Sequence, residues 1–165
     1  MHDRMRRIVV GVDGGPNSLQ ALRRAVEEAR SRGALVESVL AWTAPGGELV
    51  DRRSPSPHLR QLWTADAQER LRTAWDEALG GPPADLAVRL TVARGPAGWV
   101  LVAIADREDD LLVVGSGCRG LLRRALHTSV SRYCVARAGC PVLAVPPSRL
   151  ARQLRSPRVV VPSTP

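Results

Sequence analysis

Three glycines follow an apolar run in the second half of the chain, with the spacing of a phosphate-binding turn. Residues 111–120, LLVVGSGCRG, place Gly115, Gly117 and Gly120 in the pattern G-x-G-x-x-G. This pattern is typical of a dinucleotide site when it opens the first βα unit of a domain. Here it follows the fourth predicted strand, no acidic residue near Val135 is placed to bind a ribose, and little chain remains for a second nucleotide-binding half. The context therefore argues against a nicotinamide or flavin site.

The three cysteines are the other intrinsically reactive side chains. Their number is odd and their spacing lacks the pairs of a zinc site, so we predict reduced thiols, with Cys134 and Cys140 in the core. Cys118 lies beside Arg119 and ahead of a predicted helix, features that lower a thiol pKa and favour a redox role; an inert small residue is the alternative. The histidines are too scattered for a catalytic triad or a metal cluster. We therefore predict no catalytic residue and no required metal.

Length and composition indicate one globular domain with a short extension. The chain has 165 residues, of which 44% are hydrophobic, enough for a packed core. The net charge is +8 and every basic residue is arginine, which indicates a GC-rich genome and weakens charge as a sign of nucleic-acid binding. No apolar run approaches the roughly 18 residues that a membrane span needs, and no signal peptide is apparent. We expect a cytoplasmic protein with no membrane contact and no nucleic-acid partner.

The elements that position these residues alternate between strands and helices. Strand patterns occupy residues 7–12, 34–42, 86–93, 111–115 and 140–145. Helical patterns run from a cap at Asn17 or Ser18 to Gly33, and over 63–78, 95–108 and 130–138, whereas 43–57 is rich in Gly, Pro and Ser and is predicted to be a loop. This order predicts an α/β fold, a doubly wound parallel sheet with helices on both faces. We assign 1–146 to this domain and 147–165 to a basic Pro/Arg-rich tail.

Several segments in this order resemble the universal stress protein family. They are VVGVDGGPNSLQAL near the start, VLAW at the second strand, DLLVVGSGCRG, and CPVLAVPP at the end of the domain. The resemblance covers about residues 7–146 and implies a sheet order of 3-2-1-4-5. Ligands of open α/β sheets bind where that order reverses, at the carboxyl ends of strands one and four, which would bring Asp13 and Gly115 to one crevice. It also implies a homodimer that pairs through the last strand, Cys140 to Val145.

The family resemblance supplies a different glycine motif from the one above. ATP-binding members carry G-x2-G-x9-G followed by Ser or Thr, whose glycines let backbone N–H groups approach phosphates. On this chain the three glycine positions fall on Gly115, Cys118 and Thr128, and the hydroxyl position falls on Ser129, followed by Val130. Two glycines are thus replaced, one by a β-branched residue. We predict that ATP binding is weakened or lost, while a shifted loop that still holds ATP is the alternative.

Two further positions carry over from ATP-binding relatives. Asp13 matches the acidic residue that contacts the nucleotide, and its alternative role is to hydrogen-bond the backbone of its own turn. The backbone at Ala41 corresponds to the adenine contact. The resemblance therefore implies a regulatory or interaction protein of the stress response with an unidentified protein partner. A nucleotide-dependent ATP sensor, with slow ATP hydrolysis left open, and a basic nucleic-acid-binding module are the alternatives.

Overall fold

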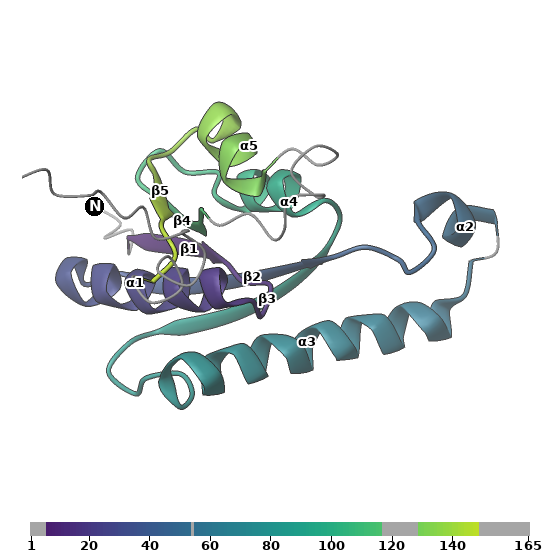
Figure 1. The fold of residues 1–165 in the computed structure, drawn as a ribbon, viewed down its shortest axis with the longest axis horizontal. Coiled ribbons are helices and arrows are strands. Elements are labelled where there is room, and N and C mark those ends of the chain that lie inside the picture. The colour runs from purple at the N-terminus through teal and green to yellow at the C-terminus, as the bar shows by residue number, and fades with distance from the viewer. Residues whose placement is uncertain (1–5, 54, 117–128, 149–165) are drawn as a thin grey trace, which may run out of the picture.

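The computed structural model describes residues 6–53, 55–116 and 129–148. Five parallel strands form its single sheet, in the order β3-β2-β1-β4-β5 (Figure 1). The strands are β1 (Arg7–Gly11), β2 (Leu35–Trp42), β3 (Val88–Arg94), β4 (Leu111–Gly115) and β5 (Val142–Val145). The predicted α/β class and the order 3-2-1-4-5 are confirmed.

Helices cover both faces of the sheet, as predicted. They are α1 (Pro16–Arg32), α2 (Glu48–Arg53), α3 (Pro57–Leu79), α4 (Ala97–Ile104) and α5 (Val130–Arg137). Helices α1 and α3 lie on one face and α4 and α5 on the other (Figure 1). None of the helices in the described part of the chain is long and apolar enough to span a membrane.

The core has two layers because side chains of a strand alternate between its faces. Ile8 and Val10 pack toward α1 and α3, whereas Val9 packs toward α4 and α5, and all three are buried. Trp75 of α3 is fully buried, and its indole N–H donates to the Ser38 hydroxyl at 2.9 Å. Small β-branched and aliphatic side chains therefore build this core, with a single large aromatic residue buried within it.

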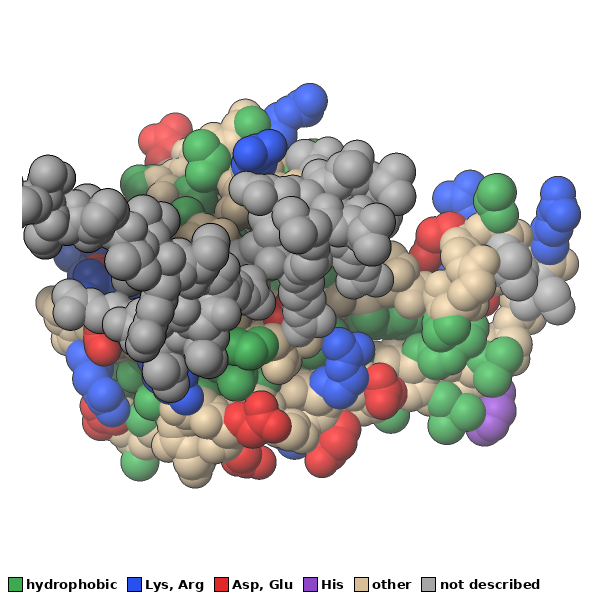
Figure 2. Space-filling view, in the orientation of Figure 1, with side chains coloured by type: hydrophobic (Ala, Val, Ile, Leu, Met, Phe, Trp, Pro, Cys, Tyr) green, Lys and Arg blue, Asp and Glu red, His purple; other side chains and the backbone are tan. Residues whose placement is uncertain are grey.

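The predicted loop at 43–57 is wrong in part, because it contains α2 and the start of α3. Helix α2 carries Glu48 and Asp51 in its first turn, where acidic residues are favoured, and both pair with Arg94 of β3. Helix α3 begins at Pro57, a residue well suited to a first helical position, and the Ser56 hydroxyl accepts from the Leu59 N–H. Together they form an arm that extends past the sheet (Figure 1), on which Leu49, Leu59 and Leu62 are exposed. Figure 2 shows hydrophobic side chains at the surface of this arm.

Other element ends shift by a few residues. Helix α1 is capped by Gly15 rather than by Asn17 or Ser18, because Pro16 takes the first helical position. Helix α4 ends at Ile104 rather than continuing to 108, since the following residues turn back to enter β4. The predicted tail 147–165 lies outside the described residues beyond Ser148.

Candidate functional site

The strand order of the sheet reverses between β1 and β4, and the first candidate site lies at the carboxyl ends of these two strands. These two strands pair in parallel, with Ile8 opposite Leu111 and Val10 opposite Val113. The chain then leaves β1 toward α1 on one face, and α5 lies on the opposite face. Diverging connections at such a switch point mark the usual ligand position in open α/β sheets, outside the strand ends, and this position is called the crevice below.

Gly115 ends β4 in direct contact with the first turn of α1. A methyl group at this position would come within 2.7 Å of the Asn17 carbonyl oxygen and 2.9 Å of its carbonyl carbon. Backbone atoms cannot yield as a flexible side chain can, so only glycine allows this close approach. The structure thereby places the end of β4 against the helix that begins just after Asp13.

The loop that carries Asp13 is held by short-range hydrogen bonds. The Asp13 carboxylate accepts from the Gly15 N–H at 2.8 Å, as in the turn role weighed above. The Ser18 hydroxyl accepts from the Asp13 N–H at 3.2 Å and donates to the Gly15 carbonyl at 2.9 Å. Gly14 has φ +77°, which favours glycine at this turn. Asp13 is solvent-exposed, so its carboxylate lies at the crevice while fixing the turn.

Ala41 lies near the end of β2, opposite Ala93 of β3, and is half-buried against the layer of α4. The Val39 carbonyl accepts from Val12 on the β1 side, and the Trp42 carbonyl accepts from Gly95 on the β3 side. Because successive carbonyl groups of a strand are directed to opposite neighbouring strands, the Ala41 carbonyl is directed to the β1 side. Strand β1 ends at Gly11, so this carbonyl faces the space beyond that strand.

The start of α5 carries two further predicted site residues, Ser129 and Val130. Ser116 follows Gly115 and donates its N–H to the Val145 carbonyl at 2.8 Å. Ser129 is the N-cap residue of α5, its hydroxyl lies 2.8 Å from the Ser131 hydroxyl, and the next residue, Val130, is exposed. Two predicted site residues, Cys118 and Thr128, lie outside the described residues, as does the redox role weighed for Cys118.

The two described cysteines are shielded to different degrees. Cys134 of α5 is fully buried, as predicted, and burial raises its thiol pKa to about 11. Cys140 is half-buried against the α4 and α5 layer, and burial raises its pKa as well. Within the described ranges, no group of His, Cys, Asp and Glu is placed to hold a metal ion.

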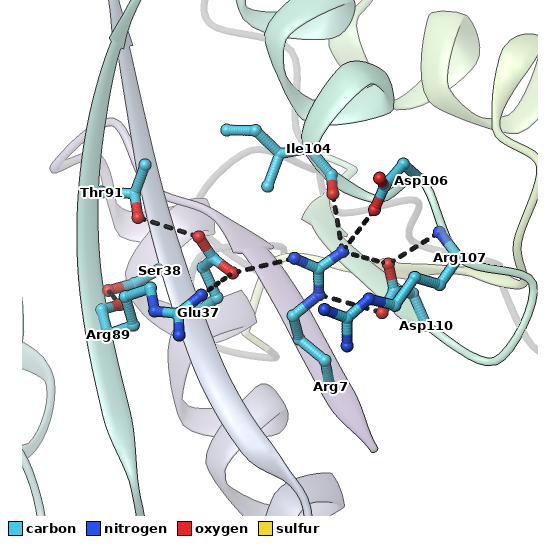
Figure 3. Close-up of polar contacts among 9 residues, drawn as sticks. All are labelled: Arg7, Glu37, Ser38, Arg89, Thr91, Ile104, Asp106, Arg107 and Asp110. Atoms are coloured by element: carbon cyan, nitrogen blue, oxygen red, sulfur yellow. Dashed lines mark hydrogen bonds and ion pairs between the residues drawn. The ribbon is translucent and has the colours of Figure 1, made fainter. Parts of the chain in front are cut away.

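Sequence reasoning missed a buried ionic cluster at the opposite, amino end of the sheet (Figure 3). The Arg7 guanidinium donates to both carboxylate oxygens of Asp110, at 3.0 and 2.6 Å, and to Glu37 at 3.2 Å. It also reaches the Ile104 carbonyl and the Asp106 carboxylate, each at 2.8 Å. The hydrogen bonds that Arg7 donates to Asp110 raise the Arg7 pKa, and the one that it donates to Asp106 lowers the Asp106 pKa.

This ionic cluster is saturated, so we assign it a structural role. Glu37 also accepts from Thr91 at 2.9 Å, and among the described residues no buried side-chain polar atom lacks a partner. The cluster ties β1 to β2 and to the connection that enters β4. The charged Glu37 inside the mostly apolar run ALVESVLAW was the signal that could have revealed it.

Comparison with known proteins relates this chain to one protein family. The model of the universal stress protein family matches residues 5–146. Universal stress protein Rv2624c of Mycobacterium tuberculosis is 32% identical over 140 residues, which cover 84% of this chain and 47% of that protein. A Mycolicibacterium smegmatis universal stress protein is 31% identical over 150 residues, covering 88% and 47%. This chain thus spans about half the length of the curated relatives it matches.

Solved structures share the fold. A universal stress protein in complex with cAMP is 27% identical, with a TM-score of 0.65, and the match covers 87% of this chain and 98% of that one. A universal stress protein from Archaeoglobus fulgidus in complex with dAMP is 22% identical, with a TM-score of 0.51, covering 86% and 97%. The second likeness concerns the fold alone.

Proposed function

Because this chain belongs to the universal stress protein family, we propose that it is a non-catalytic regulatory and interaction protein of the stress response. We further propose that its crevice binds an adenosine nucleotide with a single phosphate more tightly than ATP. The observation that carries this proposal is the contact of Gly115 with the first turn of α1. That contact sets the end of β4 against the helix that begins just after Asp13.

The base and sugar side of the crevice retains the features that an adenosine needs. The Ala41 carbonyl is directed past the end of β1, where it can accept a hydrogen bond from the exocyclic amine of adenine. The exposed Asp13 carboxylate lies in the loop after the neighbouring strand β1, where it can accept from a ribose hydroxyl or from the base. These contacts do not depend on the number of phosphates.

The phosphate side is altered in sequence. Cys118 and Thr128 replace two of the three glycines whose backbone N–H groups wrap a polyphosphate in ATP-binding relatives. Gly115, which ends β4, and Ser129, which caps α5, keep the residue types of the motif. A solved relative that is 27% identical holds cAMP, which carries one phosphate, and this supports a ligand smaller than ATP.

Calorimetric titration of the purified chain with cAMP, AMP and ATP tests the proposal. We expect cAMP or AMP to bind at least about tenfold more tightly than ATP, a difference of roughly 1.4 kcal/mol. The double variant Cys118→Gly, Thr128→Gly should strengthen ATP binding and leave AMP binding nearly unchanged, with each single variant as the matched control. A chain that binds none of the three, and whose melting temperature none of them raises, would refute the nucleotide role.

The protein partner that we propose first is a second copy of this chain, paired through β5. This strand lies at the edge of the described sheet. Val142 and Ala144 alternate along it with residues whose carbonyl groups accept hydrogen bonds on the β4 side. Their N–H groups are therefore directed to the open edge, where a symmetry mate can pair. Ala144→Pro removes one such N–H and should yield a monomer in light scattering, whereas Ala144→Val should remain a dimer. A monomeric parent chain would overturn this pairing.

A further inference from the structure

Trp99 is an exposed indole at the edge of the sheet where the crevice opens. It lies in the first turn of α4, which begins just after the carboxyl end of β3. Its side chain is 59% exposed, whereas Trp75 is fully buried and Trp42 packs against Trp63 with ring centroids 6.2 Å apart. Within the described part of the chain, Trp99 has no hydrogen bond, ring contact or cation–π partner. A large apolar ring left in water at a ligand-binding edge calls for an explanation.

The contacts of Trp99 place its ring over the end of β3. A methyl group at Gly95 would lie 3.6 Å from Cε3 and 3.8 Å from Cζ3 of the indole, so the ring rests against this glycine. Helical side chains lean toward the helix N-terminus, which for α4 is the carboxyl edge of the sheet. The Gly95 N–H donates to the Trp42 carbonyl at 2.8 Å, and Trp42 directly follows Ala41. Trp99 is thus one strand away from the carbonyl assigned to adenine.

We propose that Trp99 forms a wall of the base pocket and stacks on the adenine ring. This inference rests on the proposed nucleotide role of the crevice. The Ala41 carbonyl can read the edge of the base, and the indole can cover one of its faces. Stacking on an aromatic side chain tolerates any base, so Trp99 supplies affinity while the backbone at Ala41 supplies the choice of adenine. The layer of α4, against which Ala41 already packs, brings the two together.

Alanine substitution measures the stacking directly. Trp99→Ala should weaken AMP or cAMP binding on the order of 5- to 150-fold by calorimetry, the range that loss of one stacked base produces. Trp99→Phe should restore most of that affinity, because it keeps an aromatic face. Ribose 5-phosphate, which has no base, should bind Trp99→Ala and the parent chain equally well. Leu62→Ala, an exposed apolar residue on the α2–α3 arm, is the matched control and should leave AMP binding unchanged.

The outcomes separate the two proposals. If the parent chain binds AMP and Trp99→Ala binds it equally well, the stacking role is refuted while the nucleotide site stands. If the parent chain binds no adenosine nucleotide, both the nucleotide site and the stacking role of Trp99 are refuted. Because the Trp99 side chain is exposed, the alanine variant should keep the parent melting temperature. An equal loss of AMP and ribose 5-phosphate binding would also count against stacking, because it would indicate a distorted site.

Discussion

Replacing Gly115 with alanine should destabilise the domain through a single added methyl group. The new carbon would lie 2.7 Å from the Asn17 carbonyl oxygen and 2.9 Å from its carbonyl carbon. Both distances are well inside ordinary van der Waals contact. The obstructing atoms belong to the backbone of the first turn of α1, so relief requires β4 and α1 to move apart.

The size of the effect follows from overpacking at one site. Such insertions into a packed region typically cost about 1–3 kcal/mol. In a domain of this length, 1 kcal/mol shifts the melting temperature by roughly 2–4 °C. Gly115→Ala should therefore melt about 2–12 °C below the parent chain. It should also lose nucleotide affinity, because the movement widens the crevice at the point that frames it.

Thermal unfolding followed by circular dichroism measures this shift, and two other glycines provide controls. A methyl group at Gly139 meets no atom within 4 Å, so Gly139→Ala should be neutral or stabilising by up to about 1 kcal/mol. A methyl group at Gly11 meets the Leu101 side-chain terminus at 2.7 Å, which can rotate aside at a smaller cost. If Gly115→Ala and Gly139→Ala have the same melting temperature, the added methyl group at position 115 meets no obstacle at Asn17. The steric role of Gly115 is then refuted.

Three further predictions concern groups outside the crevice. Arg7→Met leaves the buried Asp110 carboxylate without its main partner and should cost about 3–5 kcal/mol in urea unfolding; an unchanged midpoint would refute the pairing. The pKa of Asp51 is lowered chiefly by its hydrogen bond from Arg60, so this stabilisation is present above the ordinary carboxyl pKa near 4 and is lost as pH falls below it. The melting temperature of Asp51→Asn should therefore depend less on pH between 5 and 3 than that of the parent chain. The buried Cys134 thiol, with its pKa raised to about 11, should react with iodoacetamide at pH 8 far more slowly in the native chain than in urea, as site-resolved mass spectrometry would show.

Local patterns were sufficient to predict the fold class and most of the elements, because they report directly on burial. The apolar run at residues 7–12 and the stripe that includes Leu22 and Val26 are buried where a parallel sheet and its covering helix require. The strand order itself came from the family resemblance. Alternation cannot distinguish one neighbour of a buried strand from another, since every strand presents the same apolar faces.

Features that depend on distant residues could not be predicted in this way. Residues 48–53 form a helix inside a segment of loop-like composition. Its acidic side chains pair with Arg60 of the next helix and with Arg94, which lies far along the chain. The contact between Gly115 and Asn17 likewise joins residues that are adjacent only after β1 and β4 have paired. In both cases the deciding interaction belongs to the tertiary structure, which composition and periodicity do not describe.

The two ends of the β1–β4 pair are held by contacts of different kinds. At the amino end, Arg7 and Asp110 form a buried two-point contact that fixes the separation of the strands. At the carboxyl end, Gly115 allows β4 to lie directly against the first turn of α1. Under the proposed nucleotide role, we expect the choice between one phosphate and three to depend on loop positions 118 and 128, where the sequence departs from the glycines of ATP-binding relatives.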